Sequence, residues 1–234
     1  MTASLAVVVA GASSGFGAAL AAELAAEGHQ VIAGARRPRA SSRGLMYLPV
    51  DVTDAEAVAR FAAAAISELG RVDGLVYCAA DSGAVGRAWQ VDAADAARVL
   101  DVTLLGFIRL LAHLVPEMRR SGKGSIIAIG SQAARNPVDL LSAYGAAKAA
   151  LEQYTRCLAS ELAGTGIRAN VIGISAETPL ASAHRAAKQA IRGRASGHPP
   201  LPPVTDSLPL ARWLLSPDSR HVTGQTIEAR QPEK

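Results

Sequence analysis

Short runs of β-branched and other apolar residues alternate along this chain with longer stretches in which apolar residues recur every three to four positions. The runs are typical of buried strands, and the longer stretches are typical of amphipathic helices. Because the two keep alternating, the pattern predicts an α/β fold with a doubly wound, mainly parallel sheet and helices on both faces. Strands are expected at residues 5–10, 30–35, 45–50, 73–78, 125–130, 168–174 and 225–229, and helices at residues 16–27, 54–69, 92–120 (with some irregularity), 142–163 and 206–215.

The stretch 177–204 differs from the rest of the chain, because it is rich in Ala, Arg, Gly and Pro and shows no clear strand or helix pattern. We expect a mobile lid or a disordered loop there, at a place where a substrate would be selected. No sequence repeat marks a second domain, so residues 1–234 are expected to form one domain. The basic residues of the stretch either meet an anionic group or form a solvated loop; they are Arg185, Lys188, Arg192 and Arg194.

Composition narrows the function classes. Half of the 234 residues are hydrophobic, so a sizeable core can be buried. The net charge of +4 arises from dispersed basic residues without interleaved aromatics, which argues against a nucleic-acid partner. Cys78 and Cys157 lack a CxxC spacing, which argues against a disulfide framework or a metal site and favours a cytoplasmic location. Residues 1–22 have no basic leader and are broken by glycines, which argues against a signal peptide or a membrane span.

A glycine-rich motif follows the first expected strand. It reads Gly11-Ala-Ser-Ser-Gly15-Phe-Gly17 and leads directly into a helix. Glycines at these positions allow a tight turn, close approach of the backbone to a pyrophosphate, and close packing of the next helix. The alternative is an ordinary glycine-rich turn, but the position at the first strand-to-helix junction favours a dinucleotide site in a Rossmann-type fold.

The end of the second strand indicates which dinucleotide binds. An NAD site places a carboxylate there, whereas this chain has Ala35 followed by Arg36 and Arg37. Guanidinium groups pair with a 2′-phosphate, so NADP(H) is favoured over NAD(H). The alternative is that Arg36, Arg37 and Arg39 form a solvated turn.

Candidate catalytic residues come from the second half of the chain. Tyr144 and Lys148 are four residues apart and share one face of the expected helix, where an ammonium would lower the pKa of the phenol. Ser131, at the end of the preceding strand, would hydrogen-bond the same substrate oxygen. A tyrosine and a lysine at this spacing are more often a pair on a helix surface. The catalytic interpretation is favoured because the same chain also carries the nucleotide motif.

Taken together, these motifs resemble the short-chain dehydrogenase/reductase (SDR) family across nearly the whole chain. The glycine motif, Asp51-Val52, Ser131, Tyr144, Lys148 and Val222-Thr-Gly224-Gln follow one another in family order. The resemblance implies a homodimer or homotetramer formed through the helices at 92–120 and 142–163. It also implies Lys148 at the nicotinamide ribose. With the motif residues, the cofactor-binding candidates are Gly11, Ser13, Ser14, Gly15, Phe16, Gly17, Arg36, Arg37, Asp51, Val52, Ala79, Tyr144, Lys148 and Thr178.

Several positions depart from the family pattern and mark a divergent member. Tyr77-Cys78-Ala79-Ala80 stands where the family has Asn-Asn-Ala-Gly, and Thr103 replaces an active-site asparagine that serves a water relay. Ile174-Ser175-Ala176 stands in place of a Pro-Gly pair beside the nicotinamide. The usual acidic residue and glycine pair near the C-terminus are missing, because the chain reads Ile227-Glu-Ala-Arg230. A specialised enzyme is expected.

The expected activity is NADPH-dependent reduction of a ketone to a secondary alcohol, or the reverse, on a small-molecule carbonyl or alcohol substrate. Tyr144 would act as the proton donor, Ser131 would stabilise the oxygen, and Lys148 would tune the phenol. Two alternatives remain: an NADP(H)-binding sensor or structural partner without redox turnover, and an SDR-like isomerase or dehydratase. His113 and His184 receive no catalytic role.

Overall fold

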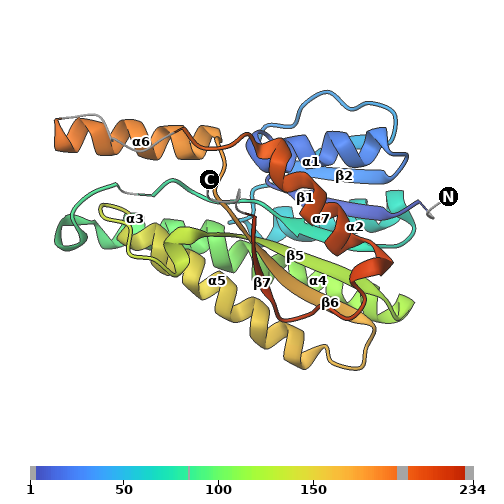
Figure 1. Cartoon of the computed structure of the whole chain (residues 1–234). Coiled ribbons are helices and arrows are strands. Elements are labelled where there is room, and N and C mark those ends of the chain that lie inside the picture. Colours follow the sequence, from blue (N-terminus) through green and yellow to red (C-terminus); the bar gives the residue numbers. More distant parts are fainter. Residues whose placement is uncertain (1–3, 84, 194–199, 230–234) are drawn as a thin grey trace.

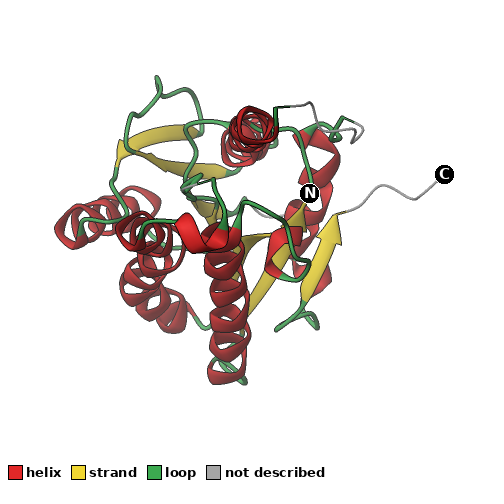
Figure 2. Ribbon diagram, turned by 90° about the vertical axis from the view of Figure 1, so that its left-hand side faces the viewer, coloured by secondary structure: helices red, strands yellow, loops and turns green. Residues whose placement is uncertain are grey.

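The structure is a computed structural model and describes residues 4–83, 85–193 and 200–229. Its centre is a parallel sheet in the order β3-β2-β1-β4-β5-β6-β7, and helices lie on both sides of the strands (Figures 1 and 2). The predicted α/β, doubly wound fold is therefore confirmed. The strands are β1 (Ala6–Ala10), β2 (Gln30–Ala35), β3 (Leu45–Pro49), β4 (Gly74–Tyr77), β5 (Gly124–Ser131), β6 (Ile167–Ile174) and β7 (Thr226–Ala229).

The helices follow the expected alternation, with bounds within a few residues of the predicted ones. Asp54 caps α2, accepting hydrogen bonds from the backbone N–H groups of Glu56 and Ala57. The α-helices are α1 (Gly15–Ala26), α2 (Ala55–Leu69), α3 (Ala93–Leu100), α4 (Gly106–Ser121), α5 (Ser142–Glu161), α6 (Pro179–Arg192) and α7 (Leu208–Leu215). Short 3₁₀ turns lie at Ala88–Gln90, Gln132–Ala134, Val204–Ser207 and Pro217–Ser219.

The strand order places a switch point at β1, which pairs with β2 on one side and with β4 on the other. In open parallel sheets the crevice at such a point, beyond the carboxyl ends of the strands, is where ligands bind. The register aligns Ala10 with Tyr77, Tyr77 with Ala128, and Ser131 with Ile174. Residues that follow these strands therefore meet at one edge of the sheet.

Each face of the sheet has its own apolar core, because successive side chains of a strand point to opposite faces. Val8 and Ala10 belong to the core under α2, α4 and α5, whereas Val7 and Val9 belong to the core under α1 and α7. Burial on both faces explains why the strands read as nearly continuous apolar runs.

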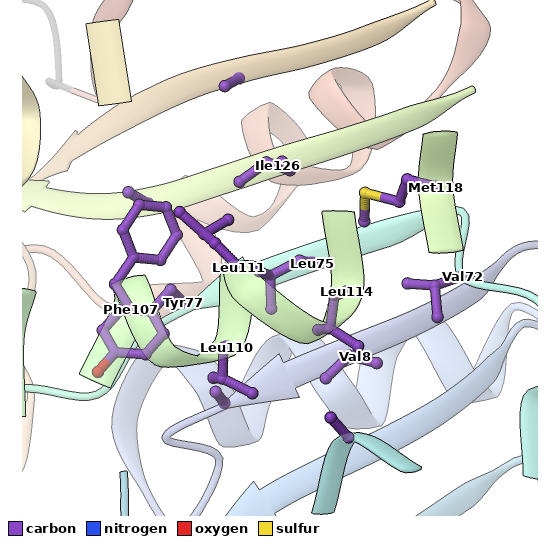
Figure 3. Packing of buried hydrophobic residues seen from close by; sticks show 14 of the residues in the cluster. Val8, Val72, Leu75, Tyr77, Phe107, Leu110, Leu111, Leu114, Met118 and Ile126 are labelled. Carbon is purple, nitrogen blue, oxygen red and sulfur yellow. The ribbon is translucent and has the colours of Figure 1, made fainter. Parts of the chain in front are cut away.

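The helix α4 shows how one core is built. Its apolar stripe, which includes Leu110, Leu114 and Met118, packs against Val8 and Leu75 of the sheet (Figure 3). By length and composition alone the helical run Ala93–Ser121 is apolar enough to cross a membrane. Here its buried face covers the sheet, as expected of a core helix in a folded domain.

The irregularity predicted within residues 92–120 is a π-helical turn, Asp101–Leu105, between α3 and α4. The N–H of Gly106 bonds to the carbonyl of Asp101, and the Tyr77 hydroxyl donates to the carbonyl of Val102. A side chain at position 106 would collide with that phenol, because its Cβ would lie 2.5 Å from the Tyr77 oxygen. Tyr77, one of the departures from the family pattern, therefore has a structural role beneath this turn.

The prediction that 177–204 lacks a regular element, and the alternative of a disordered loop, are wrong for residues 179–192. Residues 179–192 form the helix α6, which begins at the cap Thr178 and ends at the left-handed Gly193. Figure 1 shows α6 projecting to the left, past the ends of the strands. The helix was missed because its residues are polar on average, although its apolar positions do gather on one face. Arg194 and the rest of 194–199 lie outside the described residues.

Candidate functional site

A cleft of about 450 Å³ opens at the carboxyl edge of the sheet, between the loop after β1, the ends of β4, β5 and β6, and the helix α6. Every predicted site residue except Arg37 lines it. The glycine loop and the Ser131, Tyr144 and Lys148 constellation, which are more than 100 positions apart in the sequence, therefore share one cavity.

The glycine loop is tight enough to need its glycines. Gly11 has a φ of 85°, and a Cβ there would lie 2.4 Å from the backbone nitrogen of Ala79. At Gly17 a Cβ would lie 2.6 Å from the carbonyl oxygen of Gly11. The start of α1 is thus packed directly against the loop, with its N-terminus at the cleft, which is the arrangement that favours a phosphate group.

At the end of the cleft next to β2 and β3, Arg36 and Asp51 lie together. Asp51 accepts hydrogen bonds from the backbone and the hydroxyl of Thr53, and these bonds, with a smaller effect of Arg36, hold the pKa of the Asp51 carboxyl below its ordinary value. Arg37 is exposed and lies outside the cleft wall. Of the two predicted phosphate-binding arginines, the structure brings only Arg36 into the cavity.

The catalytic candidates are held by β5 and α5. Lys148 is only 2% exposed, and its ammonium donates to the carbonyl of Ile129 at 2.6 Å. The same ammonium lies 5.9 Å from the centroid of the Tyr144 ring. Ser131 ends β5 and lines the same cleft, and its hydroxyl oxygen accepts from the N–H of Ala133 at 3.2 Å.

Burial dominates the electrostatics of this group. It raises the pKa of Tyr144, and a hydrogen bond with Ser131 only partly opposes the increase. It also lowers the pKa of Lys148 to about 8, against opposing effects of Cys78 and Glu152. The expectation that Lys148 brings the phenol pKa below its ordinary value is thus wrong here, because desolvation of the phenol dominates and the opposing effect comes from Ser131.

An ionic cluster supports the lysine from the side of α5. Glu152 lies one turn after Lys148, is buried, and accepts a hydrogen bond of 2.8 Å from Arg135. Arg135 also pairs with Glu228 on β7. The pKa of Glu152 is raised by its burial, and Arg135 opposes this. The cluster links the last strand to the helix that carries both catalytic candidates.

Some of the positions that depart from the family pattern line the cleft, and others lie elsewhere. Cys78 packs near Gly17, and burial raises the pKa of its thiol to about 12, so it is protonated at neutral pH. Thr103 is fully buried in the π-helical turn, and its hydroxyl has no hydrogen-bond partner among the described residues. Ile174 and Thr178 both line the cleft, and the Thr178 side chain caps α6.

His184 is a site residue that sequence reasoning left without a role. It is 8% exposed, lines the cleft, and its ring centroid lies 4.9 Å from that of Tyr144. The only signal was its position four residues after Leu180, which places both on one face of a helix. That signal was hidden because the helix itself was not predicted.

The basic residues of α6 do not form an open anion site. Arg185 pairs with Glu177, and Arg192 pairs with Asp139. Lys188 does not line the cleft, and burial lowers the pKa of its ammonium. Within the described residues, no cluster of three or more His, Cys, Asp or Glu side chains could hold a metal ion.

Comparison with known proteins gives consistent matches. Residues 5–189 match the family described as short chain dehydrogenase. The chain is 33% identical over 171 residues to 2-dehydro-3-deoxy-L-rhamnonate dehydrogenase (NAD(+)) from Sphingomonas sp., which covers 70% of this chain and 69% of that protein. It is 39% identical over 176 residues to glycine betaine reductase ATRR from Emericella nidulans, covering 70% of this chain but only 14% of the fungal protein.

Solved structures agree with the sequence matches. A short-chain type dehydrogenase/reductase from Mycobacterium ulcerans superimposes with a TM-score of 0.85 at 30% identity, covering 97% of this chain and 89% of that one. The similarity therefore includes the sheet, the flanking helices and the cleft-forming loops.

Proposed function

Because the chain belongs to the short-chain dehydrogenase family, we propose that it is an NADP(H)-dependent oxidoreductase that reduces a ketone to a secondary alcohol or catalyses the reverse. The observation that carries this proposal is that Ser131, Tyr144 and Lys148 line the same cleft as the glycine loop. A nucleotide on the loop and a carbonyl compound beside the phenol would therefore share one cavity.

The residues present fit a nicotinamide dinucleotide. The cradle formed by Gly11 and Gly17 would be filled by any added Cβ, as expected where a backbone must approach a diphosphate closely. Asp51 and Val52 would border the adenine, and Lys148 and Thr178 the nicotinamide end. When bound, the nucleotide supplies the hydride.

The protein's own residues supply the proton and orient the oxygen. Tyr144 is protonated at neutral pH because burial raises its pKa, so it is ready to donate its proton to a carbonyl oxygen that becomes an alkoxide. Ser131 would hydrogen-bond the same oxygen and hold it at the phenol. A protonated tyrosine favours the reductive direction, because oxidation would require the phenolate first.

The choice of NADP(H) rests on Arg36, which lines the adenosine end of the cleft. Ala35 ends β2 where an NAD site would place a carboxylate. A guanidinium at this position can form a charge-assisted pair with a 2′-phosphate. One relative carries NAD(+) in its name, so family membership alone does not decide between the two nucleotides.

The test follows the absorbance of NADPH while the protein is offered a panel of ketones. Oxidation of NADPH with formation of the matching alcohol supports the proposal. Tight NADPH binding without consumption of any ketone would favour a sensor or structural partner. Conversion of a substrate without net change in NADPH, detected by product analysis, would favour an isomerase or dehydratase.

We also propose that the chain forms a homodimer or homotetramer through α3, α4 and α5. Leu100 and Leu105 are 37% and 43% exposed on this helical surface, and a contact between copies of the chain would bury both. Light scattering of the purified protein measures the assembly, and a monomer at all concentrations would contradict it.

A further inference from the structure

His184 connects three parts of the substrate side of the cleft. It lies on the inward face of α6, its Nε2 atom is 2.8 Å from the carbonyl oxygen of Ser82, and its ring meets that of Tyr144 at an interplanar angle of 72°. Edge-to-face contact of this kind is an attractive aromatic geometry. The imidazole thus attaches α6 both to the loop after β4 and to the phenol.

The hydrogen bond also determines the state of the imidazole. A carbonyl oxygen can only accept, so Nε2 must carry the hydrogen in the bond to Ser82. Burial and the nearby Lys188 lower the pKa of His184, although the Ser82 carbonyl opposes them. The ring is therefore uncharged at neutral pH, and its aromatic surface lies against Tyr144.

The cleft wall beside His184 is apolar. Four aliphatic side chains complete this apolar wall, namely Val138, Leu141, Leu180 and Leu201. Leu141 immediately precedes α5, and Leu180 lies one turn before His184 on α6. Leu201 is held nearby because the N–H of Glu177 bonds to the carbonyl of Pro202 at 2.7 Å.

Nearby cations are already matched by carboxylates. Arg98 lines the cleft but pairs with Asp81 at 3.4 Å. On α6, Arg185 and Arg192 have their own acidic partners. Arg36 and Lys148 also line the cleft, but the proposed function assigns both to the nucleotide. A carboxylate or phosphate on the substrate would therefore have to enter the apolar wall without an unpaired cation of its own among the described residues, at a large desolvation cost.

We propose that His184 is a positioning residue that forms the substrate side of Tyr144, and that the cleft selects uncharged carbonyl compounds with an apolar substituent. This rests on the proposed oxidoreductase function. The apolar substituent would lie against the apolar wall, and the contact with His184 would keep its carbonyl oxygen at the phenol. Removing the ring would weaken substrate binding without altering the nucleotide end of the cleft.

The test uses two ketones that differ at one substituent, the charged 4-acetylbenzoate and its uncharged methyl ester, with NADPH. The ester is expected to have a kcat/KM about tenfold or more above that of the acid, because burial of an unpaired carboxylate is unfavourable. Leu180→Arg, which places a cation in the apolar wall, is expected to reduce or reverse this preference.

Variants of His184 test the positioning role. His184→Ala should raise the KM for the ester about tenfold while the KM for NADPH stays within about twofold. His184→Phe keeps an aromatic edge at Tyr144 and should restore part of the loss. The matched control is His221→Gln, because His221 is exposed and does not line the cleft. Thermal denaturation confirms that each variant is folded.

Several results would overturn the inference while leaving the proposed function intact. One is a kcat/KM for 4-acetylbenzoate equal to or above that for the ester. A second is reduction of other ketones but not of the ester. A third is an unchanged kcat and KM for the ester in a folded His184→Ala variant. A protein that binds NADPH but reduces no ketone would overturn the proposed function and this substrate class together.

Discussion

The ammonium of Lys148 lies 5.9 Å from the ring centroid of Tyr144 while it donates to the carbonyl of Ile129. The lysine is thus anchored to the end of β5, and the tyrosine stands one turn before it on α5. This relationship joins the strand that carries Ser131 to the helix that carries the phenol.

Lys148→Met should lower kcat/KM for ketone reduction by about 10²–10⁴-fold, the range expected when an acid–base group loses its partner. The variant should also bind NADPH more weakly, because the lysine borders the nicotinamide end of the cleft. Steady-state kinetics and nucleotide titration measure the two effects separately. Lys188→Met is the control, since Lys188 does not line the cleft; an equal loss in both variants would contradict the assignment.

Activity should fall as the pH rises through about 8 in the free enzyme, because Lys148 loses its proton there. Burial lowers this pKa below the ordinary value of 10.5, so the unfolded chain keeps the proton longer. Burying the ammonium therefore costs stability below pH 8, and stability should rise relative to Lys148→Met between about pH 8 and 10.5. A pH profile of kcat/KM and denaturant unfolding check the two effects. A flat profile across that window would argue against the role of the ammonium.

Arg36→Ala should raise the KM for NADPH about tenfold or more and change the KM for NADH much less, because only NADPH offers a 2′-phosphate to the guanidinium. Arg37→Ala is the matched control, since Arg37 lies outside the cleft wall. Comparison of the KM values for NADPH and NADH shows whether Arg36 binds the 2′-phosphate. Equal losses with both nucleotides, or a larger effect at Arg37, would favour the solvated-turn alternative.

Gly17→Ala should weaken nucleotide binding and reduce the free energy of unfolding by about 1–3 kcal/mol, because overpacking shifts the backbone. The added Cβ would lie 2.6 Å from the Gly11 carbonyl oxygen, and a backbone atom cannot move aside cheaply. Gly86→Ala is the control, since a Cβ there would meet nothing within 4 Å. Denaturant unfolding and NADPH titration are the measurements. Normal stability and affinity in Gly17→Ala would show that the cradle is looser than the structure indicates.

Much of the fold follows from the sequence because its strongest signals are local. A strand buried on both faces reads as an apolar run, so β1 and its neighbours were predicted almost residue by residue. The glycine loop could be placed because its residues border a strand and a helix that were both recognisable. The π-helical turn was expected only as an irregularity, since the Tyr77 hydroxyl that bonds to it comes from β4, which is distant in the sequence.

The site was less predictable where it depends on contacts between distant segments. The helix α6 is polar on average, so its sequence was interpreted as a loop although its apolar positions share one face. The position of His184 beside Tyr144 could therefore not be predicted. Sequence spacing indicated that Lys148 and Tyr144 share one face of a helix, but not that burial of the phenol would raise its pKa. Arg36 and Arg37 are adjacent in the sequence, and only the direction of the backbone after β2 distinguishes them.

The most direct test of the central claim is single-turnover reduction of a ketone by Tyr144→Phe in the presence of saturating NADPH. The phenol is the proposed proton donor, and phenylalanine keeps the ring that packs against His184. The account predicts that turnover is lost while the Kd for NADPH changes by less than about twofold. Turnover close to that of the unmodified protein would contradict it.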